Sequence, residues 1–355
     1  VEHNASFLND VLKRRQGRGV VVSYHAFGAG PHDVHARYRA MRATGAEVVK
    51  IAVTVDSLNA GAELLHVGEV SDRRVIVGMG TAGMPTRILA GRYGMCWTYA
   101  GEGIAPGQQN LDRMRDRFRV RRVTPRTVVY GVLGSPVSHS LSPAMHNAGF
   151  DALNLDAVYL PLEAIDVDDF FAFARSVGLR GASVTAPFKE DVISRVSQMD
   201  DTASAVGAVN TLLRDGHRWS GRNTDVSGFL APLVSRMSLA GKRAAVLGAG
   251  GAARGVAWGL AQQGAAVRVC ARRMEQARSV SRSVGAEFGQ MPPAAESWDL
   301  LVNTTPVGTY PNGEESPVPD GALSNGLVYD LVYNPETTRL LAQASDAGCD
   351  TIGGL

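Results

Sequence analysis

Apolar and polar positions alternate in blocks over the first third of the chain. Short apolar runs, each followed by a polar amphipathic stretch, lie at 19–27 (GVVVSYHAF), 47–53 (EVVKIAV), 74–80 (RVIVGMG) and 95–101 (MCWTYAG). Their starts are about 20–28 residues apart, as strand–helix units with short loops require. Uninterrupted apolar runs are typical of parallel strands that are covered on both faces. The pattern predicts four parallel strands with helices between them.

These four units fit part of a (β/α)8 barrel, because the chemically reactive residues lie within or just after the runs, where such a barrel places its active site. A whole barrel needs ~200–250 residues, whereas only residues 1–122 precede a linker at 123–127. The chain also begins with Val1 and not with Met. We therefore expect residues 1–122 to be the C-terminal half of a barrel whose first half is missing.

A second α/β system follows the linker, and it opens with an apolar run that leads into a Ser/Pro-rich turn (128–143). A helix is expected at 223–237, with Asn223 or Thr224 as its cap. Further strands are expected at 156–163, 181–189, 208–214, 299–306, 326–333 and 349–354. We predict an α/β fold with one domain at 128–237 and a second at 238–355, whose terminal helix is missing.

Composition limits the class of protein. Of the 355 residues, 45% are apolar and 20% are charged, as in soluble globular proteins. No apolar run approaches the ~18–20 residues of a membrane span, and no secretory leader opens the chain. The three cysteines, Cys96, Cys270 and Cys349, are far apart and form no CxxC or Cys/His cluster. This usage predicts a cytoplasmic protein with no disulfide framework and no metal site.

The charge is unevenly distributed. Residues 1–127 carry 19 Lys and Arg against 11 Asp and Glu, whereas residues 128–355 carry 17 against 23. Much of the basic excess lies in 112–122 (DRMRDRFRVRR). A nucleic-acid-binding arm is one interpretation. A solvated helix end is favoured, because no aromatic stacking pattern accompanies the arginines, and we expect no nucleic-acid or membrane partner.

A glycine-rich turn at 248–253 (GAGGAA) matches the G-x-G-x-x-G/A pattern. It lies between a strand and a helix that are expected at 243–273. Backbone without side chains can approach a pyrophosphate there, whose charge is stabilised by the amides of the helix N-terminus. Glycine turns also serve close helix–strand packing alone, but this context favours a dinucleotide.

The end of the next strand distinguishes the two common dinucleotides. An NAD site usually has an acidic residue about 20 residues after the glycines, bound to the ribose 2′-OH. Here the position is occupied by Arg272 and Arg273. A carboxylate would repel a 2′-phosphate, whereas a guanidinium binds it in a bidentate manner. The arginines therefore predict NADP rather than NAD.

Polar residues at or near the ends of strands mark the domain at 128–237 as the catalytic domain. They are Lys189, Asp225 and, in the Ser-rich turn, Ser140 and Ser142. A lysine held by a carboxylate can donate the proton that reduction of a ketone requires. An ordinary surface ion pair is an equal alternative on spacing alone. The alternating hydroxyls suit a carboxylate or polyol, although a plain serine turn is the default.

In the first region, Lys50 lies within an apolar strand, between Val49 and Ile51. Burial disfavours the charged form of lysine and leaves an amine that can attack a ketone. His25 ends the preceding run and could transfer protons. A Schiff-base lysine is favoured over a satisfied core lysine, because buried lysines without a role are rare and costly.

Seven motifs occur in order between residues 130 and 335: GSPVSHSLSPAMHN, SVTAPFKE, GAVNTL, GRNTDVSGF, GAGGAARG, VNTTPVG and YDLVYNP. This series resembles the shikimate dehydrogenase family. The resemblance implies that Lys189 and Asp225 are the catalytic pair. The substrate would be held by Ser140, Ser142, Thr185, Asn210, Asp225 and Tyr333. NADP would be bound by Gly248, Gly250, Gly251, Ala252, Arg254, Arg272, Arg273, Asn303, Thr304, Thr305 and Gly354.

The motifs SYHAF, VKIAV, GMGTAGMPTR, WTYA and APGQ resemble the C-terminal half of type I 3-dehydroquinate dehydratase. By that resemblance Lys50 forms the imine, His25 is the general acid and base, and Arg87 and Gln108 bind the substrate. Two departures stand out. The serine of the family's S-A-P-G-Q is Ile104 here, and the carboxylate and arginine contacts from early barrel strands have no counterpart.

The two resemblances imply consecutive reactions on small molecules. Dehydration of 3-dehydroquinate gives 3-dehydroshikimate, which the second part reduces with NADPH to shikimate. We expect an active dehydrogenase joined to a dehydratase half that is inactive as truncated. An NAD-linked quinate/shikimate dehydrogenase and a non-catalytic sensor of the same pathway are the alternatives. The arginines oppose the first, and the retained Lys189, Asp225 and glycine turn oppose the second. The oligomeric state stays open.

Overall fold

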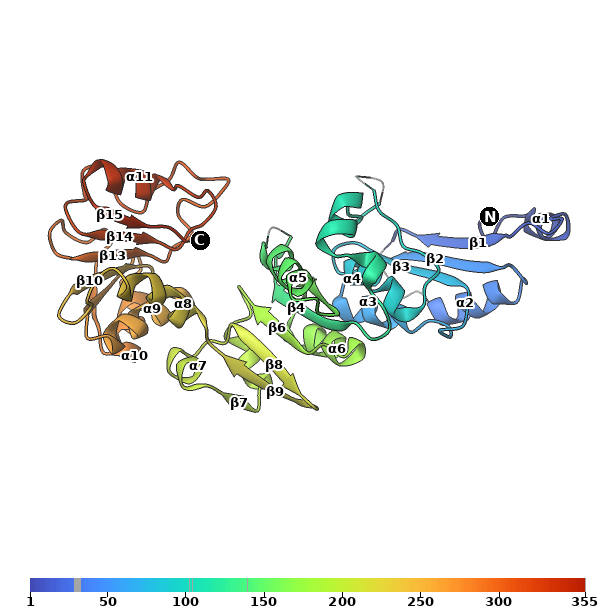
Figure 1. The fold of residues 1–355 in the computed structure, drawn as a ribbon, viewed down its shortest axis with the longest axis horizontal. Coiled ribbons are helices and arrows are strands. Elements are labelled where there is room, and N and C mark those ends of the chain that lie inside the picture. The colour runs from blue at the N-terminus through green and yellow to red at the C-terminus, as the bar shows by residue number, and fades with distance from the viewer. Residues whose placement is uncertain (29–32, 102, 104, 139, 355) are drawn as a thin grey trace. The chain divides into compact units, whose positions relative to one another are not determined.

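The computed structural model describes residues 1–28, 33–101, 103, 105–138 and 140–354 (Figure 1). It has the predicted α/β fold, with three sheets in the described part of the chain. The chain divides into two compact units, residues 1–198 with 211–220 and residues 199–210 with 221–355.

The N-terminal sheet contains three parallel strands, β1 (Val21–Ala26), β2 (Val48–Thr54) and β3 (Arg74–Met79), in sequence order. Because side chains alternate along a strand, Val49, Ile51 and Val53 of β2 all point to one face. That face packs against the helices and forms a buried core with them. The helices of this region are α1 (Leu8–Lys13), α2 (Val34–Arg42), α3 (Leu58–Leu65) and α4 (Met84–Ile88).

The fourth predicted strand, at 95–101, is wrong: the structure has no strand there. The amide of Cys96 donates to the carbonyl of Arg74 at the start of β3, at 2.9 Å, as a fourth parallel strand would begin. The ladder does not continue: within the described part of the chain, the next backbone bond that this segment donates, from the amide of Gly101, goes to the carbonyl of Gln109. A single backbone bond to β3 therefore does not extend into a fourth strand.

The second sheet has the order β5-β4-β6-β8-β9-β7. Its strands are β4 (Val128–Gly134), β5 (Ala157–Glu163), β6 (Gly181–Val184), β7 (Gln198–Met199), β8 (Thr211–Asp215) and β9 (Arg218–Arg222). β4 pairs in parallel with β5 and β6, whereas β8 runs antiparallel to β6. The helices that accompany it are α5 (Ser142–Ala152), α6 (Val167–Val177) and α7 (Asp201–Val206).

The N-terminal region packs directly on this second sheet's helix α6. The carboxylate of Asp169, on α6, accepts hydrogen bonds from the amides of Leu58 (3.0 Å) and Asn59 (2.8 Å) at the start of α3. Arg92, which precedes the linker, donates to the carbonyls of Thr127 and Val177. The junction is therefore a packed interface, built from buried polar contacts.

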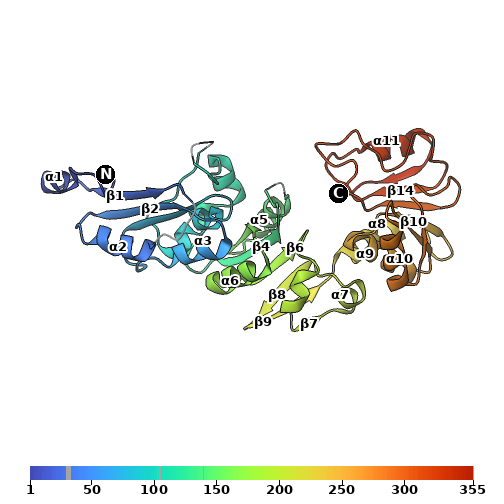
Figure 2. The same cartoon turned by 180° about the vertical axis from the view of Figure 1, so that it is seen from behind.

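The third sheet is fully parallel, with the order β12-β11-β10-β13-β14-β15. Its strands are β10 (Arg243–Leu247), β11 (Ala266–Cys270), β12 (Glu287–Gly289), β13 (Leu300–Asn303), β14 (Leu327–Asp330) and β15 (Asp350–Ile352). Helices α8 (Asp225–Val234), α9 (Gly251–Gln262) and α10 (Met274–Val284) pack on one face, and α11 (Arg339–Asp346) covers the other (Figures 1 and 2). The strand order reverses between β10 and β13, which is where doubly wound sheets bind ligands.

The basic segment 112–122 is engaged with carboxylates of the same unit. Arg115 pairs with Asp112 and Asp116, while Arg119 and Arg122 both pair with Asp151 of α5. Arg115, Arg119 and Arg122 thus have carboxylate partners within the chain, and Arg113 donates to Gln109 (3.2 Å). Among the described residues, no helix is both long and apolar enough to span a bilayer.

Candidate functional site

The glycine turn lies at the switch point of the third sheet, between the end of β10 and the start of α9. Gly248 has a φ of +113°, and a Cβ there would lie 2.6 Å from Oγ1 of Thr304, so only glycine fits. The Cβ positions of Gly250 and Gly251 face open space. Within the described residues no side chain caps α9, which leaves its first amides available to an anion.

Two arginines stand beside this turn. Arg272 and Arg273 directly follow β11, and the amide of Gly248 bonds to the carbonyl of Cys270 at the end of that strand (2.9 Å). Both arginines are exposed, and neither guanidinium has a hydrogen-bond or ion-pair partner among the described residues. Arg254, on α9, instead donates to the carbonyl of Val206 at the end of α7 (3.2 Å). Ala252 is exposed on the first turn of α9.

The segment after β13 forms the other wall of the turn. Thr304 Oγ1 donates to the carbonyl of Leu247 (2.6 Å), and Thr305 Oγ1 donates to Oδ1 of Asn303 (2.7 Å). Gly354 lies against the segment after β14: a Cβ there would be 2.5 Å from the carbonyl oxygen of Leu331. Tyr333, two residues further along that segment, is 45% exposed.

Asn210 and Asp225 come together in this unit. The Asn210 amide donates to Asp225 Oδ1 (2.6 Å) and to Thr224 Oγ1 (2.9 Å), and its oxygen accepts from the Thr224 amide (2.9 Å). Thr224 is the N-cap residue of α8, as predicted, but its side chain makes no capping bond. Asn223 Oδ1 accepts from the Asp225 amide instead (3.1 Å). The exposed Asp225 carboxylate is thus oriented by a buried amide.

The other predicted dehydrogenase residues belong to the first unit. Ser140 Oγ accepts from the amide of Ser142 at the start of α5 (3.2 Å). Thr185 follows β6, and its amide bonds to the carbonyl of Leu133 (2.8 Å). Lys189 is half-buried in the turns that follow. Because Lys189 and Asp225 belong to different units, their pairing stays a prediction.

In the N-terminal region, Lys50 and His25 are in contact. Lys50 Nζ lies 2.8 Å from His25 Nε2 and 4.8 Å from the centre of the Tyr99 ring. His25 Nδ1 lies 2.5 Å from Oε1 of Glu2, which also accepts from Ser23 Oγ (2.9 Å). Lys50 points to the opposite face of β2 from the helices, because it alternates with Val49 and Ile51.

Glu2 was not identified from the sequence, which predicted no carboxylate contact from an earlier barrel strand. The structure places Glu2 as a one-residue parallel bridge beside Ser23 of β1. A bridge of this length leaves no periodic pattern in the sequence, and only the acidic residue at the start of the chain could have drawn attention.

Arg87 and Gln108 lie further along the same region. Arg87, on α4, is only 3% exposed, and its Nε has no hydrogen-bond partner among the described residues. Burial lowers its pKa. A buried guanidinium with an unsatisfied donor suits an anionic ligand. Gln108 is half-buried, and Ile104 lies outside the described residues.

A doubly wound parallel sheet with an open glycine turn at its switch point defines a dinucleotide-binding fold. Family models match two stretches of the chain that precede this sheet. Residues 132–212 match the shikimate dehydrogenase substrate-binding domain, and residues 1–125 match type I 3-dehydroquinase.

Known proteins are similar over the same regions. A bifunctional 3-dehydroquinate dehydratase/shikimate dehydrogenase of Arabidopsis thaliana is 32% identical over 99% of this chain, which spans 63% of that protein. A shikimate dehydrogenase (NADP(+)) of Synechocystis is 40% identical over 65% of this chain and 86% of its own length. The solved structure of a Thermus thermophilus shikimate dehydrogenase, with NADP(H) and shikimate, is 35% identical, with a TM-score of 0.59 over 64% of this chain and 87% of that chain. The chain belongs to the shikimate dehydrogenase family, with a type I 3-dehydroquinase region at its N-terminus.

Proposed function

We propose that this chain is an NADP-dependent shikimate dehydrogenase, which reduces 3-dehydroshikimate to shikimate, joined to part of a type I 3-dehydroquinate dehydratase. The observation that carries the proposal is the open glycine turn with two unpaired arginines beside it. The turn suits a pyrophosphate and the guanidinia suit a 2′-phosphate. Similarity to named shikimate dehydrogenases supports the choice of substrate. The three cysteines are free thiols, which is consistent with a cytoplasmic protein.

The residues around the turn fit NADP. We assign the pyrophosphate to the backbone of Gly248 and 250–252, and the 2′-phosphate to Arg272 and Arg273. Arg254, Asn303, Thr304, Thr305 and Gly354 would line the rest of the cleft. When bound, NADPH supplies a hydride to the carbonyl carbon of the substrate.

The chain's own residues supply the proton and the orientation. Lys189 Nζ donates a proton to the substrate oxygen as negative charge develops there. Asp225 would complete the catalytic pair, and Asn210 fixes the direction of its carboxylate through the 2.6 Å contact. Ser140, Ser142, Thr185 and Tyr333 would hold the carboxylate and hydroxyls of the substrate.

In the N-terminal region, Lys50 is the nucleophile that would form an imine with the ketone of 3-dehydroquinate, releasing water. His25, 2.8 Å from Lys50 Nζ, would transfer the protons. Glu2 accepts from one nitrogen of His25 and thereby directs the other nitrogen to Lys50. Arg87 and Gln108 would bind the substrate carboxylate and a hydroxyl.

The test is steady-state kinetics of the full chain with shikimate and either NADP or NAD, monitored by nicotinamide absorbance. Lys189→Ala or Asp225→Asn should lower kcat by roughly 10²–10⁴, as loss of general acid–base catalysis does, with little change in NADP affinity. The exposed Lys242→Ala and Asp215→Asn are matched controls that should leave kcat unchanged. Near-normal kcat in Lys189→Ala would exclude the assigned pair. Preference for NAD would favour the quinate/shikimate alternative, and NADP binding without turnover would favour a sensor.

A further inference from the structure

Asp330, the last residue of β14, is a carboxylate that none of the assigned roles uses. Its side chain is 0% exposed, and burial raises its pKa. Burying a carboxylate is costly unless several donors compensate it. Three uncharged groups donate to it: Asn303 Nδ2 (2.9 Å) and the amide of Val332 (3.0 Å) to Oδ1, and Thr338 Oγ1 (2.6 Å) to Oδ2.

The first of these partners holds one wall of the glycine turn. The Asn303 side chain accepts from the amide of Thr305 (3.0 Å) and its hydroxyl (2.7 Å), and it donates to the carbonyl of Val307 (3.3 Å). These bonds fold 304–307 into a tight turn. That turn places Thr304 against Leu247 and Gly248, where the glycine turn begins.

The second partner belongs to the segment that carries Tyr333. The amide of Val332 is fixed on Asp330 Oδ1, the same oxygen that accepts from Asn303. One carboxylate oxygen therefore joins the cofactor-side turn to the segment next to Tyr333. The other oxygen faces Thr338, the residue that caps α11 by accepting from the Leu341 amide (3.3 Å).

We infer that Asp330 is a positioning residue, whose Oδ1 sets the turn at 304–307 for NADP and couples it to the Tyr333 segment. The inference rests on the proposed NADP-dependent function. The division between the two oxygens makes it specific: Oδ1 serves the cofactor site, whereas Oδ2 serves only the attachment of α11.

Replacing the Asp330 carboxylate with an amide separates a role that needs only hydrogen bonds from one that needs the negative charge. In Asp330→Asn, Oδ1 can still accept from Asn303 and Val332, while Nδ2 can donate to the Thr338 hydroxyl, which also accepts. Asp330→Ala removes all three bonds, so that the buried Asn303 side-chain amide keeps only its longer bond to the carbonyl of Val307 (3.3 Å) and loses its second acceptor.

The experiment measures NADP binding to the full chain by calorimetry, without shikimate, and then the KM for shikimate. Asp330→Ala should weaken NADP binding at least tenfold and raise the KM, whereas Asp330→Asn should stay within about threefold of wild type. Asn303→Ala should reproduce the loss of NADP affinity, so the test survives if Asp330→Ala does not fold.

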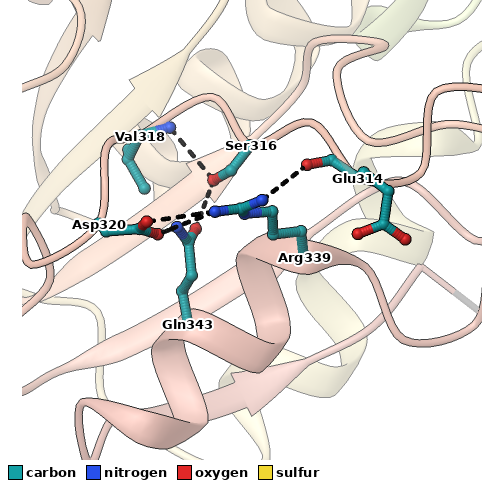
Figure 3. Close-up of polar contacts among 6 residues, drawn as sticks. All are labelled: Glu314, Ser316, Val318, Asp320, Arg339 and Gln343. Atoms are coloured by element: carbon teal, nitrogen blue, oxygen red, sulfur yellow. Dashed lines mark hydrogen bonds and ion pairs between the residues drawn. The ribbon is translucent and has the colours of Figure 1, made fainter.

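Two controls separate positioning from general destabilisation. Thr338→Val removes the Oδ2 partner and the cap of α11 but leaves both bonds to Oδ1 in place, so it should lower Tm without changing NADP affinity. Asp320 is a carboxylate on the surface that also holds α11, where it accepts from Arg339 and Gln343 (Figure 3). Asp320→Asn should likewise leave NADP affinity unchanged.

The outcomes divide clearly. Unchanged NADP affinity in Asp330→Ala and Asn303→Ala, or equal losses in Asp330→Asn and Asp330→Ala, would overturn the inference. A loss in Thr338→Val as large as that in Asp330→Ala would also overturn it. If the wild-type chain binds NADP but does not oxidise shikimate, the proposed function fails while the binding test of Asp330 still stands.

Discussion

Asp169 offers a quantitative test of the interface between the N-terminal region and helix α6. Its carboxylate is 7% exposed and accepts from three backbone amides: Leu58 (3.0 Å) and Asn59 (2.8 Å) of α3, and Ile165 (3.3 Å) of its own segment. The perturbation is Asp169→Ala, which leaves two amides of the α3 N-terminus without a partner. Ser57 Oγ continues to cap only Ala60 (3.2 Å).

The magnitude follows from these contacts. Loss of a helix N-cap costs about 0.5–2 kcal/mol, and each hydrogen bond to a charged group contributes ~1.5–3 kcal/mol when both partners are buried. Water can replace part of this once the side chain is gone, so we expect a loss of about 2–4 kcal/mol. Because 1.4 kcal/mol is a factor of ten, local opening of α3 should become ~30–1000-fold more frequent.

Hydrogen exchange read by mass spectrometry over residues 57–65 measures that opening directly. Fluorescence of Trp219, which packs against Phe171 of α6 with ring centres 5.6 Å apart, follows the other side of the interface during urea unfolding. The neighbouring Asp168→Ala is the matched control. Its side chain is 65% exposed, and surface ion pairs contribute ~0–1 kcal/mol. Equal exchange of 57–65 in wild type and Asp169→Ala, or equal acceleration in both variants, would refute the reasoning.

Three further predictions concern the remaining sites. Arg272→Ala with Arg273→Ala should weaken NADP binding tenfold or more and leave NAD nearly unaffected, because each bond to phosphate contributes ~1.5–3 kcal/mol; equal losses in calorimetry would mean that they do not bind the 2′-phosphate. Gly134→Ala should cost ~1–3 kcal/mol and raise the KM for shikimate, since its Cβ would lie 2.5 Å from Thr185 Cγ2; an unchanged urea midpoint would contradict this. The Arg243 guanidinium lowers the pKa of Asp299 from 3.8 to about 2, so this pair stabilises the fold above pH 4 and the contribution disappears as pH falls towards 2. Asp299→Asn should therefore flatten the loss of stability between pH 4 and 2 in acid titrations.

The strands were predictable wherever both faces are covered. Runs such as 47–53 and 74–80 correspond to β2 and β3 within one residue, because short apolar runs rich in Val and Ile favour a buried strand over a helix. The run at 95–101 contains no Val or Ile, unlike those two runs, and it forms irregular structure. An apolar run does not by itself show whether its backbone will pair with the adjacent strand, so the pattern alone could not exclude a strand at 95–101.

The candidate site was predictable where the backbone itself imposes the residue type. Gly248 must be glycine at a φ of +113°, and the position of Arg272 follows from the length of one strand–helix–strand unit. The side-chain contacts were not predictable in the same way. Asn210 and Asp225 were each identified from their motifs, yet their 2.6 Å bond depends on how the segment before β8 meets the start of α8.

The carboxylates that the sequence did not single out have one physical property in common: each has at least one hydrogen-bond partner that lies more than 20 residues away along the chain. Glu2 contacts a histidine 23 residues on, Asp330 an amide 27 residues back, and Asp169 a backbone 111 residues away. A sequence pattern reports local periodicity, whereas a buried carboxylate is retained only if the tertiary structure brings donors to it. The distribution of donors then differentiates the roles. Glu2 contacts a titratable ring and can influence proton transfer, and Asp169 accepts from helix amides and fixes an interface. Asp330 accepts from the Asn303 side-chain amide and positions the turn at 304–307 beside the glycine turn.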